Sequence, residues 1–283
     1  MSQHPTNYLI RSLGFDQQIR IIFIENTNLA QERCNDLPVA PLIKKALAQT
    51  LSIAGLVSGT LKDTQRISLR VLADDQRYQI LAEADAEGNV RGFISQPMLE
   101  ISPNQISKMT LPEFFGNKGV IQVIKDLGRY GKMFTGVTKM LFGNIVDDFS
   151  YYFEQSEQVP SEFMLQVEFD ANGQITLSRG LFAQLLPGAS KQLMDEIKQL
   201  SEASSLWTPT TAMYTAVQQL PQIEILSVNP VQFHCNCSQD MLRQVVSQLT
   251  PAELQEYLNR HENIEIVCNM CGTKYYFDPK TFI

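Results

Sequence analysis

The chain has 283 residues, 44% of them hydrophobic, which is enough for one sizeable domain and a smaller one. Its formal net charge of −7 disfavours a nucleic-acid-binding protein and gives no attraction to an anionic membrane. Residues 1–20 lack the apolar run of a signal peptide, and no apolar stretch approaches the roughly 18 residues that a membrane helix needs. We therefore expect a soluble, cytoplasmic protein.

The first 180 residues carry strand and helix patterns in no regular alternation. A long helix is predicted from Pro41 to about Lys62, where apolar residues recur at helical spacing, and a second one from Asp147 to Gln155. Together with several predicted strands, these helices indicate an α+β fold with an N-terminal mixed α/β-sheet domain. The predicted strands are 19–25, 66–72, 78–84, 90–95, 120–125, 163–169 and 174–178, and turns are predicted at 26–28, 74–76 and 170–173.

This N-terminal region carries no catalytic signature. It has no glycine-rich phosphate loop, no HExxH motif and no GxSxG motif, and His4 is its only histidine. Cys34 stands alone, and we interpret it as an inert structural thiol rather than a reactive one. The chain is therefore not expected to be an enzyme.

Residues 181–226 have a pattern typical of short amphipathic helices. Each predicted helix is below the roughly 12–15 residues at which an isolated helix becomes marginally stable, so it must dock its apolar face to persist. Two interpretations stay open: an ordinary part of the core, or a helical linker whose order depends on docking. The apolar faces carry Leu193, Ile197, Leu200, Met213, Val217 and Leu220.

Four of the five cysteines fall within 37 residues near the end of the sequence, as the pairs Cys235/Cys237 and Cys268/Cys271. Closely spaced thiolates are typical ligands of a closed tetrahedral zinc site. In a reducing compartment such pairs bind metal or sense redox state more often than they form permanent disulfides. An iron–sulfur cluster also takes four thiolates and stays open as an alternative. Chance burial of two close pairs is disfavoured in a chain with so few cysteines.

The rest of residues 227–283 predicts a small folded module around these cysteines. Ser238 is positioned to cap a helix, and Thr250–Glu253 is a capping box with proline at the first helical position. Two short strands are predicted at 264–267 and 274–277, on either side of the second cysteine pair. The module is therefore expected to be a four-cysteine zinc-binding domain.

The segments that contain the CxC and CxxC pairs, Phe233–Ser238 and Val267–Gly272, are followed by Tyr276 and Phe277. Together they resemble the zinc domain of the heat shock protein 33 family of redox-regulated chaperones. Similar segments elsewhere extend the resemblance over nearly the whole chain. They are Arg91–Phe93, Asn144–Asp148, Tyr152–Phe153, Ser156–Gln158 and Gln184–Gly188.

The resemblance implies an ATP-independent chaperone of the holdase type that protects unfolded or oxidatively damaged client proteins. Its expected parts are a chaperone core at 1–180, a helical regulatory linker at 181–226 and a redox-switch domain at 227–283. The active, oxidised form is expected to be a homodimer. The expected client-binding residues are Leu193, Ile197, Leu200, Met213 and Val217.

The resemblance also implies how the cysteines act. Cys235, Cys237, Cys268 and Cys271 would hold one Zn²⁺ in the reduced, inactive form. Four cysteines allow three pairings, and the family pattern implies that oxidation joins Cys235 to Cys237 and Cys268 to Cys271. Zinc release would then unfold the module and loosen the linker.

Two other classes of protein were weighed. A zinc-ribbon module for nucleic acid is disfavoured because residues 227–283 hold four basic and six acidic residues. A thiol–disulfide oxidoreductase would cycle its cysteines catalytically, but nothing resembles the fold that carries the usual CxxC motif. His234 and His261 are interpreted as surface residues rather than ligands.

Overall fold

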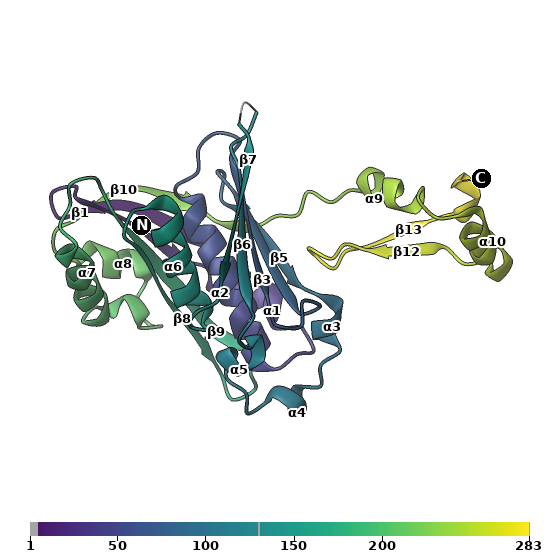
Figure 1. Cartoon of the computed structure of the whole chain (residues 1–283), viewed down its shortest axis with the longest axis horizontal. Coiled ribbons are helices and arrows are strands. Elements are labelled where there is room, and N and C mark those ends of the chain that lie inside the picture. Colours follow the sequence, from purple (N-terminus) through teal and green to yellow (C-terminus); the bar gives the residue numbers. More distant parts are fainter. Residues whose placement is uncertain (1–4, 130, 283) are drawn as a thin grey trace. The chain divides into compact units, whose positions relative to one another are not determined.

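The structure is a computed structural model that describes residues 5–129 and 131–282 (Figure 1). It contains two compact units, Met1–Phe233 and His234–Ile283. Residues 181–226 belong to the first unit, so their separate status as a linker stays a prediction about function. None of the helices in the described ranges is long and apolar enough to cross a membrane.

A five-stranded antiparallel sheet forms one layer of the first unit, in the order β10-β1-β2-β9-β8. Its strand β2 is a nearly continuous apolar run, which is typical of a strand buried on both faces. The sheet is accordingly covered on both sides. Its strands are β1 Tyr8–Gly14, β2 Ile19–Glu25, β8 Ser161–Phe169, β9 Ile175–Leu185 and β10 Ile223–Pro230.

A six-stranded sheet forms the other layer, in the order β11-β5-β4-β3-β6-β7. Its inner strands alternate buried residues with more exposed ones, so one face lies on the core and the other faces outward. The short β11 pairs with β5, and β7 forms the opposite edge. Its strands are β3 Arg66–Leu72, β4 Gln79–Asp85, β5 Asn89–Ile94, β6 Val120–Asp126, β7 Met133–Lys139 and β11 Gln232–Phe233.

The long helix α2 lies between the two sheets (Figure 1). It packs on strands of both layers, and nearly all of its side chains beyond Leu42 are buried. Gly55 allows a close approach of the helix to β2, because a Cβ atom there would lie 2.5 Å from the end of the Ile24 side chain, which would have to shift. The helices that precede β8 in the chain are α1 Thr27–Cys34, α2 Pro41–Ser58, α3 Gln96–Leu99, α4 Pro103–Ile106, α5 Leu111–Phe115 and α6 Ile145–Glu157.

The short helices that follow β9 pack on the five-stranded sheet. They form a hydrophobic cluster with it that is separate from the one around α2. This cluster includes Ile10 of β1, Phe23 of β2 and Leu181 of β9, whose side chains are fully buried. The predicted amphipathic helices are thus present, and they are docked. They are α7 Gln192–Glu202, the 3₁₀-helix η1 Ser205–Trp207 and α8 Met213–Gln218.

The second unit is a β-hairpin with two helices and a short 3₁₀-helix. Its hydrophobic core has only a handful of buried side chains: Leu242, Val246, Leu254, Ile264 and Phe277. A core this small gives limited stability by itself. The elements are α9 Gln239–Val246, α10 Pro251–Arg260, β12 Ile264–Val267, β13 Lys274–Phe277 and η2 Pro279–Phe282.

Most of the predicted elements agree with the structure. Strands β2, β3, β12 and β13 have the predicted bounds, and most others differ by one or two residues at their ends. The capping roles predicted for Ser238 and Thr250 are confirmed. The turn predicted at 26–28 is wrong, because Thr27 begins α1, which buries Leu29 and Ala30 in the core.

Four of the described strands were not predicted, namely β1, β7, β10 and the short β11, and β9 is longer than expected. The strand predicted to end at Ser178 continues through Gly180 to Leu185. Gly180 does not interrupt the strand. It makes room for the Leu165 side chain of the neighbouring β8, with which a Cβ atom at this position would clash at 2.1 Å.

Candidate metal centre

Cys268 and Cys271 lie in the turn between β12 and β13. The Cys268 N–H donates to the Thr273 carbonyl at 2.9 Å, and the Gly272 N–H donates to the Cys268 carbonyl at 2.7 Å. Gly272 has a φ of +75°, with nothing close to the position of a Cβ atom, so the left-handed backbone is what favours glycine there. These bonds form a compact knuckle that presents two thiols.

Cys235 and Cys237 lie in an extended segment just before α9. Ser238 follows them as the N-cap, and its hydroxyl accepts a hydrogen bond from the Met241 N–H at 3.2 Å. The Tyr275 hydroxyl on β13 donates to the Cys237 carbonyl at 3.2 Å. This bond ties the first cysteine pair to the hairpin that carries the second pair.

The four Sγ atoms form one cluster, in which all lie within 4.8 Å of one another. The Sγ atoms of Cys235 and Cys268 are 3.7 Å apart, and those of Cys237 and Cys271 are 3.3 Å apart. Tetrahedral zinc with sulfur at about 2.3 Å places its ligand atoms about 3.8 Å from one another. The number, type and spacing of these donors therefore fit a closed four-thiolate site.

The thiols differ in their affinity for protons. Burial raises the pKa of Cys235 to about 12 and also raises the pKa of Cys268. Burial acts in the same direction on Cys271, but hydrogen bonding with Thr273, Cys237 and Cys268 together outweighs it and lowers that pKa to about 7. The cluster does not ionise all its thiols at neutral pH, so four thiolates require the positive charge of a bound cation.

The predicted ligand set is thus gathered in one place, and the histidines take no part in it. His234 and His261 are exposed, as expected, and the cluster that could hold a metal consists of the four cysteines. The same donors suit an iron–sulfur cluster, so the choice of zinc remains a proposal.

The five predicted client-binding residues also come together, within the first unit. They pack in the cluster on the five-stranded sheet, where four are buried and Leu200 is half-buried. Docked helices of this kind agree with both interpretations of residues 181–226, a core segment and a releasable linker. The buried four are Leu193, Ile197, Met213 and Val217.

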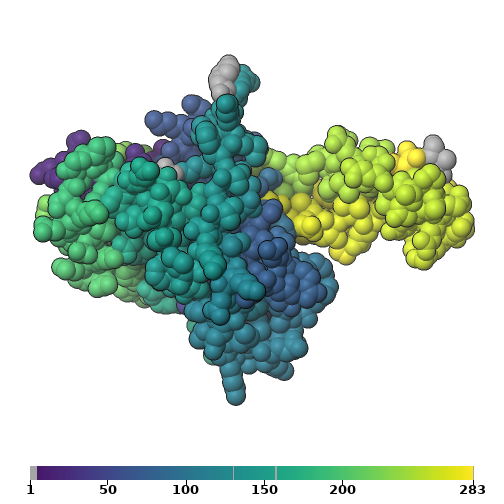
Figure 2. Space-filling model, viewed as in Figure 1, coloured from purple at the N-terminus to yellow at the C-terminus, as the bar shows by residue number. Residues whose placement is uncertain are grey.

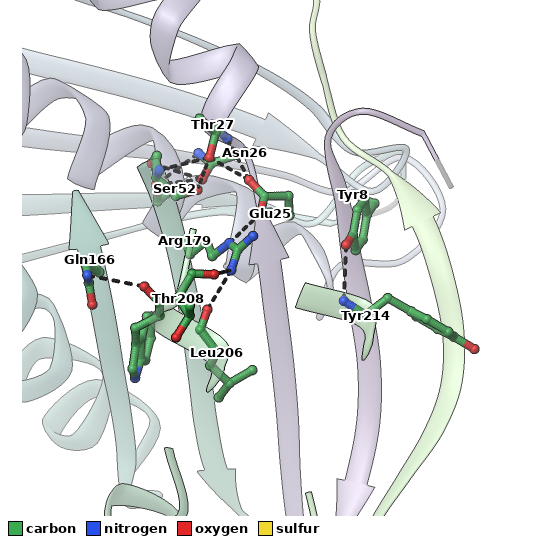
Figure 3. Close-up of polar contacts among 12 residues, drawn as sticks. Tyr8, Glu25, Asn26, Thr27, Ser52, Gln166, Arg179, Leu206, Thr208 and Tyr214 are labelled. Carbon is green, nitrogen blue, oxygen red and sulfur yellow. Dashed lines mark hydrogen bonds and ion pairs between the residues drawn. The ribbon is translucent and has the colours of Figure 1, made fainter. Parts of the chain in front are cut away.

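A polar contact that the sequence analysis missed holds the same segment to the sheet (Figure 3). Glu25 on β2 and Arg179 on β9 are directly opposite in the strand register and form an ion pair, with side chains 12% and 5% exposed. Arg179 Nη1 also donates to the carbonyls of Leu206 and Thr208, at 2.9 and 3.0 Å. We call these four residues the Arg179 latch.

A second bond lies nearby, where the Tyr8 hydroxyl accepts a hydrogen bond from the Tyr214 N–H at 3.2 Å (Figure 3). The only sequence signal for the latch was a lone arginine within the apolar stretch Ile175–Leu185. Its partner could not be found from sequence, because Glu25 is more than 150 residues away.

The fold and the site define a class of protein: a layered α+β body followed by a small module with a cluster of four cysteines that could hold a metal ion. The family model described as Hsp33 protein matches residues 7–278. The chain therefore belongs to the Hsp33 family. The relatives below are named as chaperonins rather than as enzymes, in agreement with the absence of catalytic motifs from the sequence.

Two curated relatives illustrate the match. The 33 kDa chaperonin of Oceanobacillus iheyensis is 31% identical over 278 residues, covering 96% of each chain. That of Desulforamulus reducens is 32% identical over 285 residues, covering 97% of this chain and 95% of the relative. The crystal structure of the 33 kDa chaperonin from Thermotoga maritima has a TM-score of 0.79 at 21% identity, covering 98% and 97% of the two chains. At that identity the last match supports the fold alone.

Proposed function

We propose that this chain is a redox-regulated, ATP-independent holdase of the cytoplasm that keeps unfolded or oxidatively damaged proteins from aggregating. The observation that carries the proposal is the cluster of four Sγ atoms within 4.8 Å, in a unit with a very small core. The relatives named 33 kDa chaperonin support the chaperone part of it.

In the reduced form, Cys235, Cys237, Cys268 and Cys271 would hold one Zn²⁺. A structural zinc of this type supplies on the order of 10–16 kcal/mol of apparent stabilisation, more than the roughly 3–5 kcal/mol of net stability that a core this small supplies. The folding of His234–Ile283 would therefore depend on these thiolates remaining reduced.

Oxidation would join Cys235 to Cys237 and Cys268 to Cys271. When each disulfide forms, its two thiolates together pass two electrons to an oxidant such as hydrogen peroxide, which is reduced to water. Each disulfide also removes two metal ligands. The two Sγ contacts described above run between the pairs, so sulfur proximity does not select this outcome. The shorter loops do favour it, by about 2 kcal/mol of closure entropy.

Unfolding of the second unit would loosen residues 181–226 and break the Arg179 latch. The apolar faces of α7 and α8, and the sheet surface beneath them, would then become available to clients. We further propose that the oxidised form is a homodimer. Its partners would be unfolded polypeptides, with no role for nucleic acid or membrane.

The decisive experiment compares reduced and peroxide-treated protein in light-scattering assays with a thermally unfolding test protein. We expect suppression by the oxidised form alone, together with release of one zinc per chain to a chromogenic chelator. Cys271→Ser should abolish zinc binding, whereas the matched control Cys34→Ala should keep it. Equal suppression by both redox forms would refute the switch, and catalytic reduction of insulin would favour an oxidoreductase.

A further inference from the structure

The outer edge of the six-stranded sheet is open. The Met140 N–H donates to the Gly119 carbonyl at 2.9 Å, which continues the regular register between β7 and β6. In an antiparallel pair, alternate residues turn their backbone groups toward the partner strand, so every second residue of β7 faces away from β6. Among the described strands, none pairs with that side of β7. The outward-facing positions are Met133, Thr135, Val137 and Lys139.

The strand at this edge carries large apolar side chains in the open. Met133, Phe134 and Val137 are 67%, 56% and 61% exposed. Edge strands are commonly protected by charges, proline or bulges. Between Met133 and Thr138, β7 has none of these, whereas the edge strand β10 has a register shift and ends in Pro230. The hairpin β6–β7 also projects from the surface of the first unit (Figure 2).

The charge of this hairpin is opposite to that of the whole chain. Residues 120–139 contain four basic residues and one acidic residue, in a chain with a net charge of −7. Of the basic side chains, Arg129, Lys132 and Lys139 are exposed. A second copy would bring two positive hairpins together, and lipid would leave the open backbone groups without hydrogen bonds. An extended polypeptide with acidic residues pairs its carboxylates with the basic side chains of the hairpin and its backbone groups with the open edge of β7.

We propose that the open edge of β7 binds an extended apolar segment of an unfolded client, flanked by acidic residues, as an additional strand. This inference rests on the proposed chaperone function and specifies the chemistry of its clients. A few backbone hydrogen bonds give weak binding alone, because each strengthens it by only about two- to tenfold. The edge is already exposed while the four cysteines are free thiols, so client binding there does not depend on oxidation and is always weak. Avidity arises when oxidation exposes a second surface for the same client.

The test uses the full-length chain in its reduced, zinc-loaded form. The probe is a fluorescein-labelled peptide of alternating valine and threonine with two glutamates at each end, followed by fluorescence anisotropy. A second peptide has the same side chains but is N-methylated at two adjacent central residues, which blocks both of its edges. We expect the methylated peptide to bind about tenfold more weakly, because two or so hydrogen bonds are lost.

The matched protein variants are Thr135→Pro and Thr135→Val. Proline removes an N–H from the open edge and leaves the ladder to β6 intact, whereas valine retains the N–H. We expect a loss of about two- to tenfold with Thr135→Pro, which removes one hydrogen bond, and little change with Thr135→Val. Should the proline variant fail to fold by circular dichroism, the pair of peptides still decides the question.

Several results would overturn the proposal. Equal binding of the two peptides would do so, as would unchanged binding by folded Thr135→Pro. Tighter binding to phosphatidylglycerol vesicles, insensitive to Thr135→Pro, would assign the hairpin to a membrane. Self-association abolished by Thr135→Pro would assign it to a second copy. Peptide binding by the reduced protein, without aggregation suppression by the oxidised protein, would retain the edge site and reject the holdase.

Discussion

Glu25 and Arg179 form a buried charged pair in the five-stranded sheet. Burying two charges is costly unless their other hydrogen-bonding groups are satisfied. Here Glu25 accepts hydrogen bonds from the Thr27 hydroxyl and N–H, while Arg179 reaches the Leu206 and Thr208 carbonyls. The pair is therefore positioned to hold the segment around η1, and removing one member leaves the other buried without its partner.

The variant Arg179→Met tests the latch in the reduced, zinc-loaded protein. We expect a loss of about 3 kcal/mol or more in unfolding free energy, because Glu25 is left buried and uncompensated. Hydrogen exchange should rise first across residues 205–214. The control is Arg77→Met, whose ion pair with Asp75 is 72% and 37% exposed, so its loss should change the unfolding free energy little. Identical exchange in both variants would show that apolar packing alone holds the segment.

The isolated thiol of Cys34 gives a prediction that depends on pH. Burial raises its pKa to about 12, although Arg33 and Lys44 act in the opposite direction. At pH 9 native Cys34 should react with iodoacetamide about a thousandfold more slowly than in the unfolded chain, whose cysteine pKa is about 8.5. The unfolded state then binds fewer protons, so this thiol lowers stability as pH rises from about 9 toward 12. Peptide mapping of labelled native protein is the measurement, and rapid labelling at pH 9 would contradict an inert role.

At the scale of elements, the strands predicted correctly are those whose own residues determine them. Strands β2 and β3 have β-branched runs or clear alternation, and β12 and β13 flank the cysteine knuckle. Strand β7 has no buried face and two threonines and a glycine among its seven residues, so no periodic pattern marks it. Strands β1 and β10 stabilise each other by pairing, but they lie at opposite ends of the unit's sequence. A local sequence pattern therefore does not encode their register.

The candidate sites divide in the same way. The cysteine cluster could be predicted because its members come in two close pairs, each set by local chain geometry. The Arg179 latch could not, because it requires β2, β9 and η1 to be neighbours. The open edge of β7 likewise depends on a strand order that becomes visible only in the assembled sheet.

The docked helices give an element-scale prediction. In the reduced form, hydrogen exchange should be slow in α7 and α8, whose apolar faces are buried, and fast after oxidation. The change should be largest between Gln192 and Gln218 and smaller in the flanking strands β9 and β10. Exchange measured by mass spectrometry on both forms is the test. Equal protection in a form that has lost zinc and gained holdase activity would place the switch elsewhere.

At the scale of the molecule, the two units differ greatly in core size. The first has two large hydrophobic clusters, while the second has five buried apolar side chains. Chelation of the metal from reduced protein should therefore unfold His234–Ile283 and leave the two large sheets folded, as the loss of about 10–16 kcal/mol far exceeds what so small a core supplies. Limited proteolysis should cut beyond Phe233 first. A single cooperative transition of both units would contradict this independence.

The strand order of the first unit also has a consequence for how the chain is made. Strand β1 pairs with β10, so Tyr8 cannot pair with Pro230 until more than 200 further residues have been made. The apolar run Ile19–Ile24 likewise lacks its neighbour β9 until residues 175–185 have been made. Contacts of such long sequence separation form slowly and leave nascent chains prone to aggregation. During its own synthesis, this protein is exposed to the hazard from which we propose that it protects others.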